Sequence, residues 1–242
     1  MQSPQQNSGT HGMPQVGTRR ALILSGAGRY ADRWHPFAAT SVRISHILRD
    51  VGFAVEVSET VDESLAALQS DARAVDLLVV NVGNPLEPAQ ADASSRAGML
   101  AHVGRGGAVL SMHVSATSFP AIPEWEAIMG GIWVRGTTRH PDSGLAQIKV
   151  YPDRHAIVAT LHDFTVFDER YSYLRTAEEV VPLATHEHEG IEHPLVWAWN
   201  YGSARVAYDA LGHDARSYES AEHCELVGRA ALWLVGELDD AG

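Results

Sequence analysis

The stretch that decides the fold of this chain is Gly106-Gly107-Ala108-Val109-Leu110-Ser111-Met112-His113-Val114-Ser115-Ala116-Thr117. Glycines precede an apolar run and small residues follow it, as in a buried strand of a parallel sheet that enters a tight turn. His113 stands at the tip of that turn. In α/β folds such a bend lifts one side chain above the carboxyl edge of the sheet, where a nucleophile is common. A histidine there, instead of Ser or Cys, argues against a covalent mechanism and favours acid–base or metal chemistry.

The chain before this stretch alternates between apolar runs and helix-length segments. The expected strands are 20–26, 53–57 and 75–82, and the expected helices are 37–51, 65–68 and 92–104. Strands and helices that alternate at this spacing imply right-handed parallel crossovers. We therefore predict an α/β fold with a doubly wound, mostly parallel sheet and flanking helices, of the flavodoxin-like kind.

The pattern changes after His113. A short helix is expected at 125–129, and strand or loop pieces at 145–151 and 157–161. Further expected elements are a polar cluster within 164–173, two facing strands at 180–185 and 194–200, a strand at 203–209 and a last helix at 220–237. We interpret His186-Glu187-His188-Glu189-Gly190 as a solvated hairpin loop and not as a metal-binding tract, because it ends in turn residues.

Length and composition favour one domain. The chain has 242 residues, of which 1–18 form a Gln-, Ser- and Gly-rich tail with no lysine or arginine, and 19–238 form the predicted domain. The tail does not resemble a secretory signal, and no apolar run reaches the ~20 residues of a membrane span. Cys224 is the single cysteine, so no intramolecular disulfide can form. These features predict a cytoplasmic protein that does not contact a membrane.

Charge excludes one class of partner and a weak motif excludes one cofactor. Lys and Arg number 18 against 30 Asp and Glu, a formal net charge of −12, with no basic run that could follow a phosphate backbone. We therefore expect no nucleic acid partner. Gly26-Ala27-Gly28 lacks a third glycine at the spacing of a dinucleotide-binding loop, so we reject a Rossmann cofactor site.

Several segments together resemble a known family. They are His113-Val114-Ser115-Ala116-Thr117, Gly136-Thr137-Thr138-Arg139-His140-Pro141, Asp168-Glu169-Arg170-Tyr171, His193-Pro194-Leu195-Val196-Trp197 and Ala210-Leu211-Gly212-His213-Asp214. With the elements around them, they make the chain resemble the ThuA-like, or trehalose utilisation, family. The resemblance implies the fold of class I glutamine amidotransferases and a role in sugar metabolism, on trehalose-like disaccharides or on 3-keto-glycosides made by a partner oxidoreductase.

The chain departs from the family at one position and from amidotransferases at another. Val114 stands where the family usually has Ser, so a step that needs a hydroxyl there is not expected. Amidotransferase chemistry does not carry over, because it needs a cysteine at the tip of the turn, and His113 occupies that position in this chain.

The catalytic candidates are His113, His213, Glu169 and Asp168. Residues that follow the strands of an open α/β sheet gather at one edge, which favours both histidines. The adjacent carboxylates can supply a general base where burial raises the pKa. The structural alternatives stay open: His113 as a buried histidine bonded to backbone, His213 as a turn residue, Asp168 as a turn cap, and Glu169 paired with an arginine.

Other polar and aromatic residues are candidates for substrate binding. They are His35, Asn81, His140, Trp34, Tyr171 and Asp214. Trp133 and Trp197 are further aromatics that can stack on a sugar face, although packing in the core is the ordinary role of such residues. Asp214 can instead cap the next helix.

No cofactor is required by the sequence, but a divalent metal such as zinc is an open alternative. Its ligands would come from His113, His140, His213 and Glu169, a set of neutral imidazoles with one carboxylate. The leading hypothesis is a carbohydrate-processing enzyme that uses histidine and carboxylate acid–base chemistry on a glycoside or its 3-keto derivative. The alternatives are a non-catalytic sugar-binding or accessory subunit and a metal-dependent hydrolase. Expected partners are a small sugar, a sugar oxidoreductase and, as an alternative to a monomer, a second copy of the chain.

Overall fold

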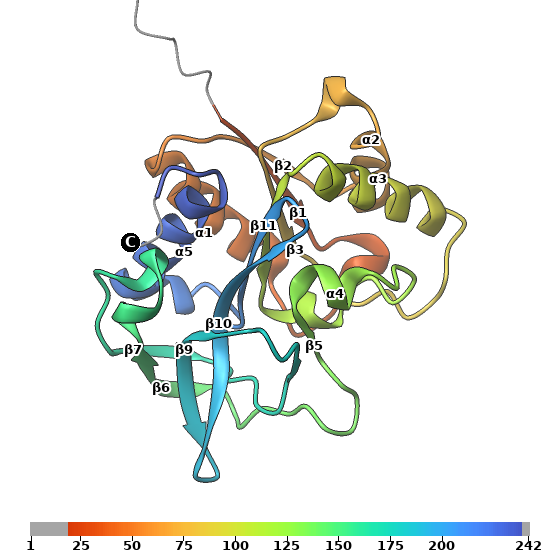
Figure 1. Cartoon of the computed structure of the whole chain (residues 1–242). Helices are drawn as coiled ribbons and strands as arrows, with labels where there is room; N and C mark the ends of the chain where they lie inside the picture. Colours follow the sequence, from red (N-terminus) through yellow and green to blue (C-terminus); the bar gives the residue numbers. More distant parts are fainter. Residues whose placement is uncertain (1–18, 239–242) are drawn as a thin grey trace, which may run out of the picture.

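The computed structural model describes residues 19–238, so the predicted tail lies outside the described residues. Its centre is a nine-stranded sheet in the order β2-β1-β3-β4-β11-β10-β9-β6-β7 (Figure 1). The strands are β1 (Arg20–Ser25), β2 (Ala54–Ser58), β3 (Leu77–Asn81), β4 (Ala108–Met112), β6 (Gly144–Val150), β7 (Phe164–Asp168), β9 (Pro182–His188), β10 (Ile191–Tyr201) and β11 (Ala204–Asp209). Two short strands, β5 (Gly131–Ile132) and β8 (Arg175–Thr176), pair separately.

One half of the sheet is parallel, and its central strands are buried. Strands β2, β1, β3, β4 and β11 pair in parallel, and every residue of β3 and β4 is buried. Helices cover both faces: α1 (Phe37–Asp50) and α5 (Ala221–Leu234) pack together on one, and α2 (Val61–Ala67) and α3 (Asp92–Gly104) on the other (Figure 1). The predicted doubly wound α/β sheet with flanking helices is therefore confirmed.

A glycine sets how closely α3 lies on α2. A Cβ atom on Gly98 would lie 1.7 Å from the carbonyl oxygen of Leu65. Only a residue without a side chain allows the two helix backbones to approach this far.

The second half of the sheet is antiparallel. Strand β10 pairs with β11 and β9, β9 with β6, and β6 with β7. The sequence placed His186–Gly190 in a solvated loop, and that interpretation is wrong: β9 continues to His188, the turn is Glu189–Gly190, and His186 is 1% exposed. The cross-strand pairing of His186 with His193 carries both side chains onto the same covered face. The piece expected at 157–161 begins instead as a 3₁₀ turn, Ala156–Val158.

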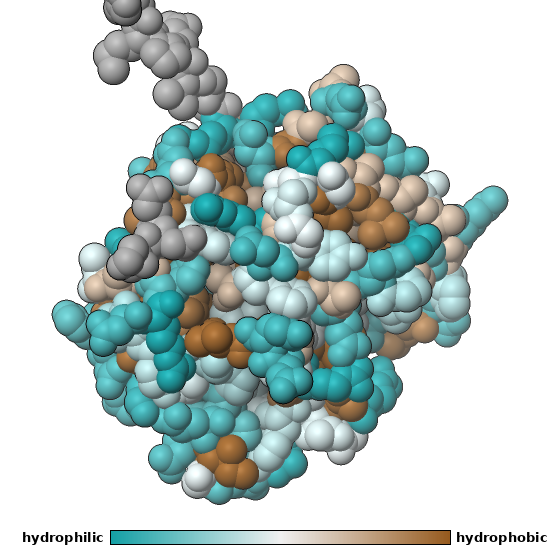
Figure 2. Space-filling model, in the orientation of Figure 1, coloured by the Kyte–Doolittle hydropathy of each residue, from teal (hydrophilic) through white to brown (hydrophobic). Residues whose placement is uncertain are grey.

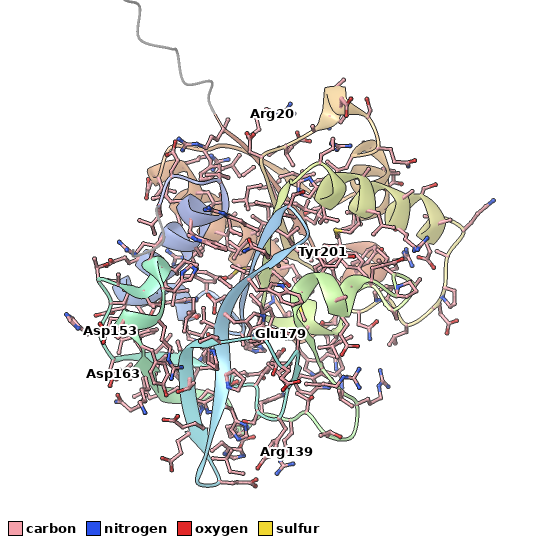
Figure 3. All side chains as sticks on the ribbon, in the orientation of Figure 1. Arg20, Arg139, Asp153, Asp163, Glu179 and Tyr201 are labelled. Atoms are coloured by element: carbon pink, nitrogen blue, oxygen red, sulfur yellow. The ribbon has the colours of Figure 1, made fainter. Side chains whose placement is uncertain are left out.

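The strand ends place the functional candidates. Strand β4 ends at Met112 and a 3₁₀ turn, His113–Thr117, follows it, with a short helix α4 (Trp125–Met129) beyond. His113 has a positive φ of 40°, which confirms the sharp bend predicted there, but its side chain is buried, at 2% exposure. Arg20, at the amino end of β1, and Arg139, in the loop that holds His140, lie at opposite ends of the molecule (Figure 3).

The surface drawn in Figure 2 is mainly hydrophilic, and its apolar side chains form separate patches. Scattered apolar residues of this kind are ordinary on protein surfaces. No helix within residues 19–238 combines the length and the apolar character that a membrane crossing requires.

Candidate functional site

Four side chains from four parts of the chain converge on one point. They are His35 in the loop between β1 and α1, His113 after β4, Glu169 after β7, and His213 after β11. One nitrogen or oxygen atom of each lies within 4.8 Å of the corresponding atoms of the other three. We call this group the His/Glu cluster.

His113 is held in one orientation. Its Nδ1 lies 2.6 Å from the carbonyl oxygen of Ala210, which can only accept, so Nδ1 carries the proton. The lone pair of Nε2 then accepts a hydrogen bond from the hydroxyl of Tyr171 at 3.0 Å. The Tyr208 hydroxyl donates to the carbonyl oxygen of His113 at 2.9 Å and fixes the strained backbone at the bend.

Glu169 is the carboxylate among the three imidazoles. Its Oε2 lies 3.3 Å from His213 Nδ1 and 3.6 Å from His113 Nε2. Burial disfavours the charged form of Glu169, but the close His113 and His213 imidazoles outweigh burial and hold its pKa well below the usual range. Burial also disfavours charged His213, yet the Glu169 carboxylate raises the pKa of that imidazole. The site therefore keeps an ionised carboxylate at neutral pH.

His35 is oriented by a carboxylate of its own loop. Its Nδ1 lies 2.8 Å from Asp32 Oδ2, and burial lowers the pKa of the His35 imidazole despite that carboxylate. Asp32 was not among the residues singled out from the sequence, although the Asp-x-x-His spacing could have shown it.

Two ring nitrogens of the cluster are buried and lack hydrogen bonds. Within residues 19–238, His35 Nε2 and His213 Nδ1 have no hydrogen-bond partner. A buried polar atom left unpaired costs roughly 1–3 kcal/mol. Both nitrogens therefore suit a ligand that accepts an electron pair or donates a proton.

Asp168 lies beneath the cluster and does not belong to it. It is 2% exposed, and its carboxylate accepts backbone N–H groups of Glu169 (2.8 Å), Gly212 (2.7 Å) and His213 (3.1 Å). These bonds tie the end of β7 to the loop after β11. Asp168 thus positions Glu169 and His213 together.

Two predicted side chains flank the cluster. His140 Nε2 lies 3.7 Å from Glu169 Oε2, and its side chain is 35% exposed. Tyr171 is buried, and its ring contacts the rings of His113, His140 and Trp133 at centroid distances of 4.3, 5.9 and 4.7 Å. Trp133, His140 and Tyr171 form an aromatic wall beside the carboxylate.

Three other candidates are not members of the His/Glu cluster. Asn81 is buried and its amide donates to the hydroxyls of Thr40 and Ser41, both at 2.9 Å. Trp34 is 62% exposed. Asp214 forms an ion pair with Arg216.

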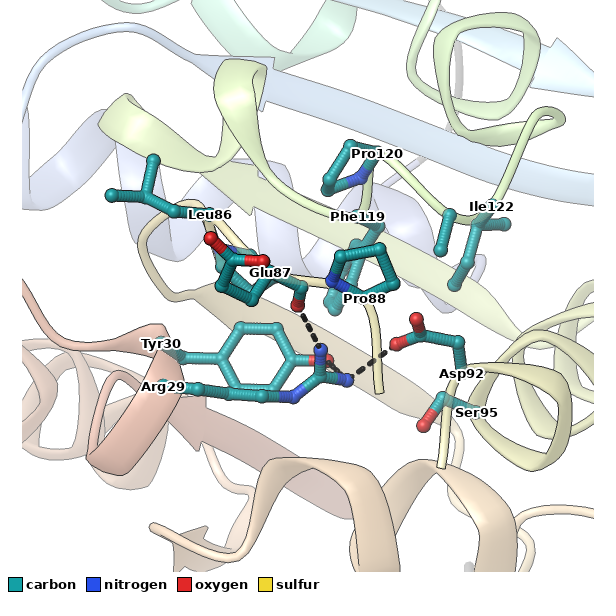
Figure 4. A pocket seen from close by; sticks show the side chains of 12 residues that line it. Arg29, Tyr30, Leu86, Glu87, Pro88, Asp92, Ser95, Phe119, Pro120 and Ile122 are labelled. Carbon is teal, nitrogen blue, oxygen red and sulfur yellow. Dashed lines mark hydrogen bonds and ion pairs between the residues drawn. The ribbon is translucent and has the colours of Figure 1, made fainter. Parts of the chain in front are cut away.

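A separate cavity of about 230 Å³ lies between the loops after β1, β3 and β4 (Figure 4). Its walls are mostly apolar, with Leu86, Phe119 and Ile122 among them, and it is lined by residues other than the His/Glu cluster. The guanidinium of Arg29 in this cavity is paired with Asp62 and Asp92. Because both carboxylates already pair with Arg29, its guanidinium is not free to bind an anionic ligand in this cavity.

The model of the ThuA family, described as trehalose utilisation, matches residues 20–234. The chain belongs to the ThuA family. The comparison with curated proteins gave no match.

Solved structures share the fold of this ThuA-family chain. A ThuA-like protein from Parabacteroides merdae is 20% identical, with a TM-score of 0.73, and the match covers 93% of this chain and 92% of that one. A ThuA-like protein from Bacteroides uniformis is 15% identical, with a TM-score of 0.72, covering 94% and 95%. A glutamine amidotransferase from Thermotoga maritima is 9% identical, with a TM-score of 0.56, covering 90% and 99%. At these identities the likeness establishes the fold, which is that of class I glutamine amidotransferases.

Proposed function

We propose that this ThuA-family chain is an enzyme that processes a glycoside, or its 3-keto derivative, by proton transfer at the His/Glu cluster. The observation that carries the proposal is the convergence of three imidazoles and an ionised carboxylate at one point. The family's description as trehalose utilisation supports a sugar as the substrate class.

The chemistry suits a sugar that carries a ketone at C3. The ketone acidifies the C2–H bond, so a basic group can remove that proton. The electron pair of the C2–H bond forms a double bond between C1 and C2, and the C1–O bond to the leaving sugar breaks. The leaving oxygen takes a proton and departs as an alcohol. Water can then add across the new double bond, so that the net reaction is hydrolysis.

The residues present divide between the two proton transfers. The basic side is the His/Glu cluster, where Glu169 is ionised and the unpaired nitrogen of His213 faces it. We assign His140 as the donor to the leaving oxygen, because it is the more exposed imidazole beside Glu169. Trp133, the half-buried tryptophan of the aromatic wall, gives the sugar a face to pack against.

The keto substrate requires an earlier oxidation at C3. We therefore propose a sugar oxidoreductase as the supplier of the substrate and the cytoplasm as the place of reaction. A homodimer remains an expectation.

The test is product formation by NMR from disaccharides and their 3-keto derivatives, with exchange of the C2 hydrogen followed in D₂O. We expect release of the second sugar and C2 exchange, both lost in His213→Gln. His162→Gln, on the exposed surface, is the matched control. Absence of both release and exchange with every substrate would refute the proposed function.

A further inference from the structure

We propose that the His/Glu cluster binds one divalent transition-metal ion of the zinc type, through His35 Nε2, His113 Nε2, Glu169 Oε and His213 Nδ1. The role of this ion in catalysis rests on the proposed function, but ion binding itself does not. The first observation is that one nitrogen or oxygen atom of each of these four residues lies within 4.8 Å of the corresponding atoms of the other three.

The second observation is the state of the nitrogens. His35 Nε2 and His213 Nδ1 are buried and unpaired among residues 19–238, yet their side chains are only 12% and 14% exposed. A cation at the centre of the cluster would accept both lone pairs at once and would also be bound by the Glu169 carboxylate, whose Oε2 lies 3.3 Å from His213 Nδ1.

The third observation concerns the opposite ring nitrogens. His35 Nδ1 bonds Asp32 at 2.8 Å, and His113 Nδ1 bonds the carbonyl oxygen of Ala210 at 2.6 Å. Ligating histidines ordinarily donate their second N–H to a carboxylate or a backbone carbonyl, which turns the other nitrogen toward the metal. Both kinds of partner are present here, and each leaves Nε2 as the donor atom.

The distances are close to those of a metal centre. Metal bonds of about 2.0–2.2 Å in tetrahedral geometry place neighbouring ligand atoms about 3.3–3.6 Å apart. Glu169 Oε2 is already 3.3 Å from His213 Nδ1 and 3.6 Å from His113 Nε2. The Tyr171 hydroxyl now occupies the lone pair of His113 Nε2, and ion binding would exchange that hydrogen bond for a metal bond.

The donor set selects the class of ion. Three imidazoles with one carboxylate suit zinc and its transition-metal neighbours, whereas magnesium and calcium prefer oxygen ligands. His140 stands outside the set, although the sequence offered it as a ligand in place of His35. Such an ion would polarise the ketone oxygen of the substrate. Glu169, bound through one carboxylate oxygen, would keep the other to take the C2 proton, and His140 would remain free to donate its own proton.

The experiment measures metal before activity. Untagged protein is purified without added metal, its metal content is measured by mass spectrometry, and chelated protein is titrated with Zn²⁺ and with Co²⁺, whose visible spectrum reports nitrogen ligands. We expect one ion per chain, and affinity lower by tenfold or more in His35→Gln and in His213→Gln, with circular dichroism to confirm folding. The exposed His162→Gln variant should bind as the native chain does.

Each outcome decides one of the two proposals. Native-like affinity in both His35→Gln and His213→Gln, or no ion bound by the folded native chain, would overturn the metal site. Turnover that persists in fully chelated protein would contradict a catalytic ion while leaving the proposed function standing. An ion that binds as expected in a chain without turnover would support the metal site and count against the proposed function.

Discussion

Asp168→Asn tests how the site is assembled, because it alters one buried carboxylate without touching the cluster's donor atoms. The native carboxylate accepts three backbone N–H groups, two at Oδ1 and one at Oδ2. An asparagine keeps one oxygen and places an NH₂ group at the other position. The NH₂ group cannot accept a hydrogen bond from a backbone N–H, so at least one bond to a charged acceptor is lost. When the remaining oxygen stays toward Glu169, the Gly212 N–H is the group that is left buried and unpaired.

The magnitude follows from those contacts. A hydrogen bond to a charged group is worth about 1.5–3 kcal/mol and a buried unpaired donor costs about 1–3 kcal/mol, so we expect a loss of about 3 kcal/mol. With a urea m-value of about 2–3 kcal/mol/M, the unfolding midpoint should fall by about 1 M. Because the loop that carries His213 is displaced, Zn²⁺ affinity should also fall by roughly 10–100-fold.

The assay is urea unfolding followed by circular dichroism, with zinc titration of the same preparations. Asp153→Asn, an exposed residue, is the control and should stay within about 0.5 kcal/mol of the native chain. An Asp168→Asn variant as stable as that control would show that the carboxylate does not hold the two loops together.

Three further predictions concern packing, pH and proton donation. Gly98→Ala should cost about 1–3 kcal/mol or more in urea unfolding, because its Cβ would meet the Leu65 carbonyl, whereas Gly104→Ala on the same helix meets nothing within 4 Å and should be neutral. Burial disfavours the charged form of His223, but the buried Asp209 carboxylate beside it raises the pKa of the imidazole. The native chain should therefore exceed His223→Gln in stability most below about pH 6.5, the unfolded value, and the excess should shrink as pH rises through the raised folded pKa; a gap that widens with pH would contradict this. His140→Gln should lower turnover by roughly 10²–10⁴-fold with one zinc still bound, and loss of the zinc would show that it is a ligand.

The sequence was informative where a candidate follows a parallel strand. His113 comes directly after β4, and His213 lies in the loop that follows β11; the two strands are neighbours in the sheet. Because parallel strands end at one edge, strand prediction alone was enough to expect the two side chains together. His35 was expected at the same edge for the same reason, after β1.

Contacts between segments that are distant in the sequence place the residues whose positions could not be predicted. Glu169 follows β7, the last strand of the antiparallel half, and it reaches the cluster only because Asp168 is bonded to the backbone of Gly212 and His213. No local sequence pattern predicts these hydrogen bonds between two distant loops. The same holds for His186, which is buried through its pairing across the β9–β10 hairpin although its neighbours in sequence are charged.

Hydrogen bonds distinguish core residues from site residues where their position at a strand end does not. Asn81 and His113 both stand where a buried strand of the same sheet ends, and both were candidates for the site. The Asn81 amide has two hydroxyl acceptors and is therefore a finished part of the core. His35 and His213 each keep one buried nitrogen without a hydrogen bond among residues 19–238, and both residues belong to the cluster that includes Glu169. Because folded proteins rarely leave such atoms unpaired, the two unpaired nitrogens mark the place where a ligand completes the structure.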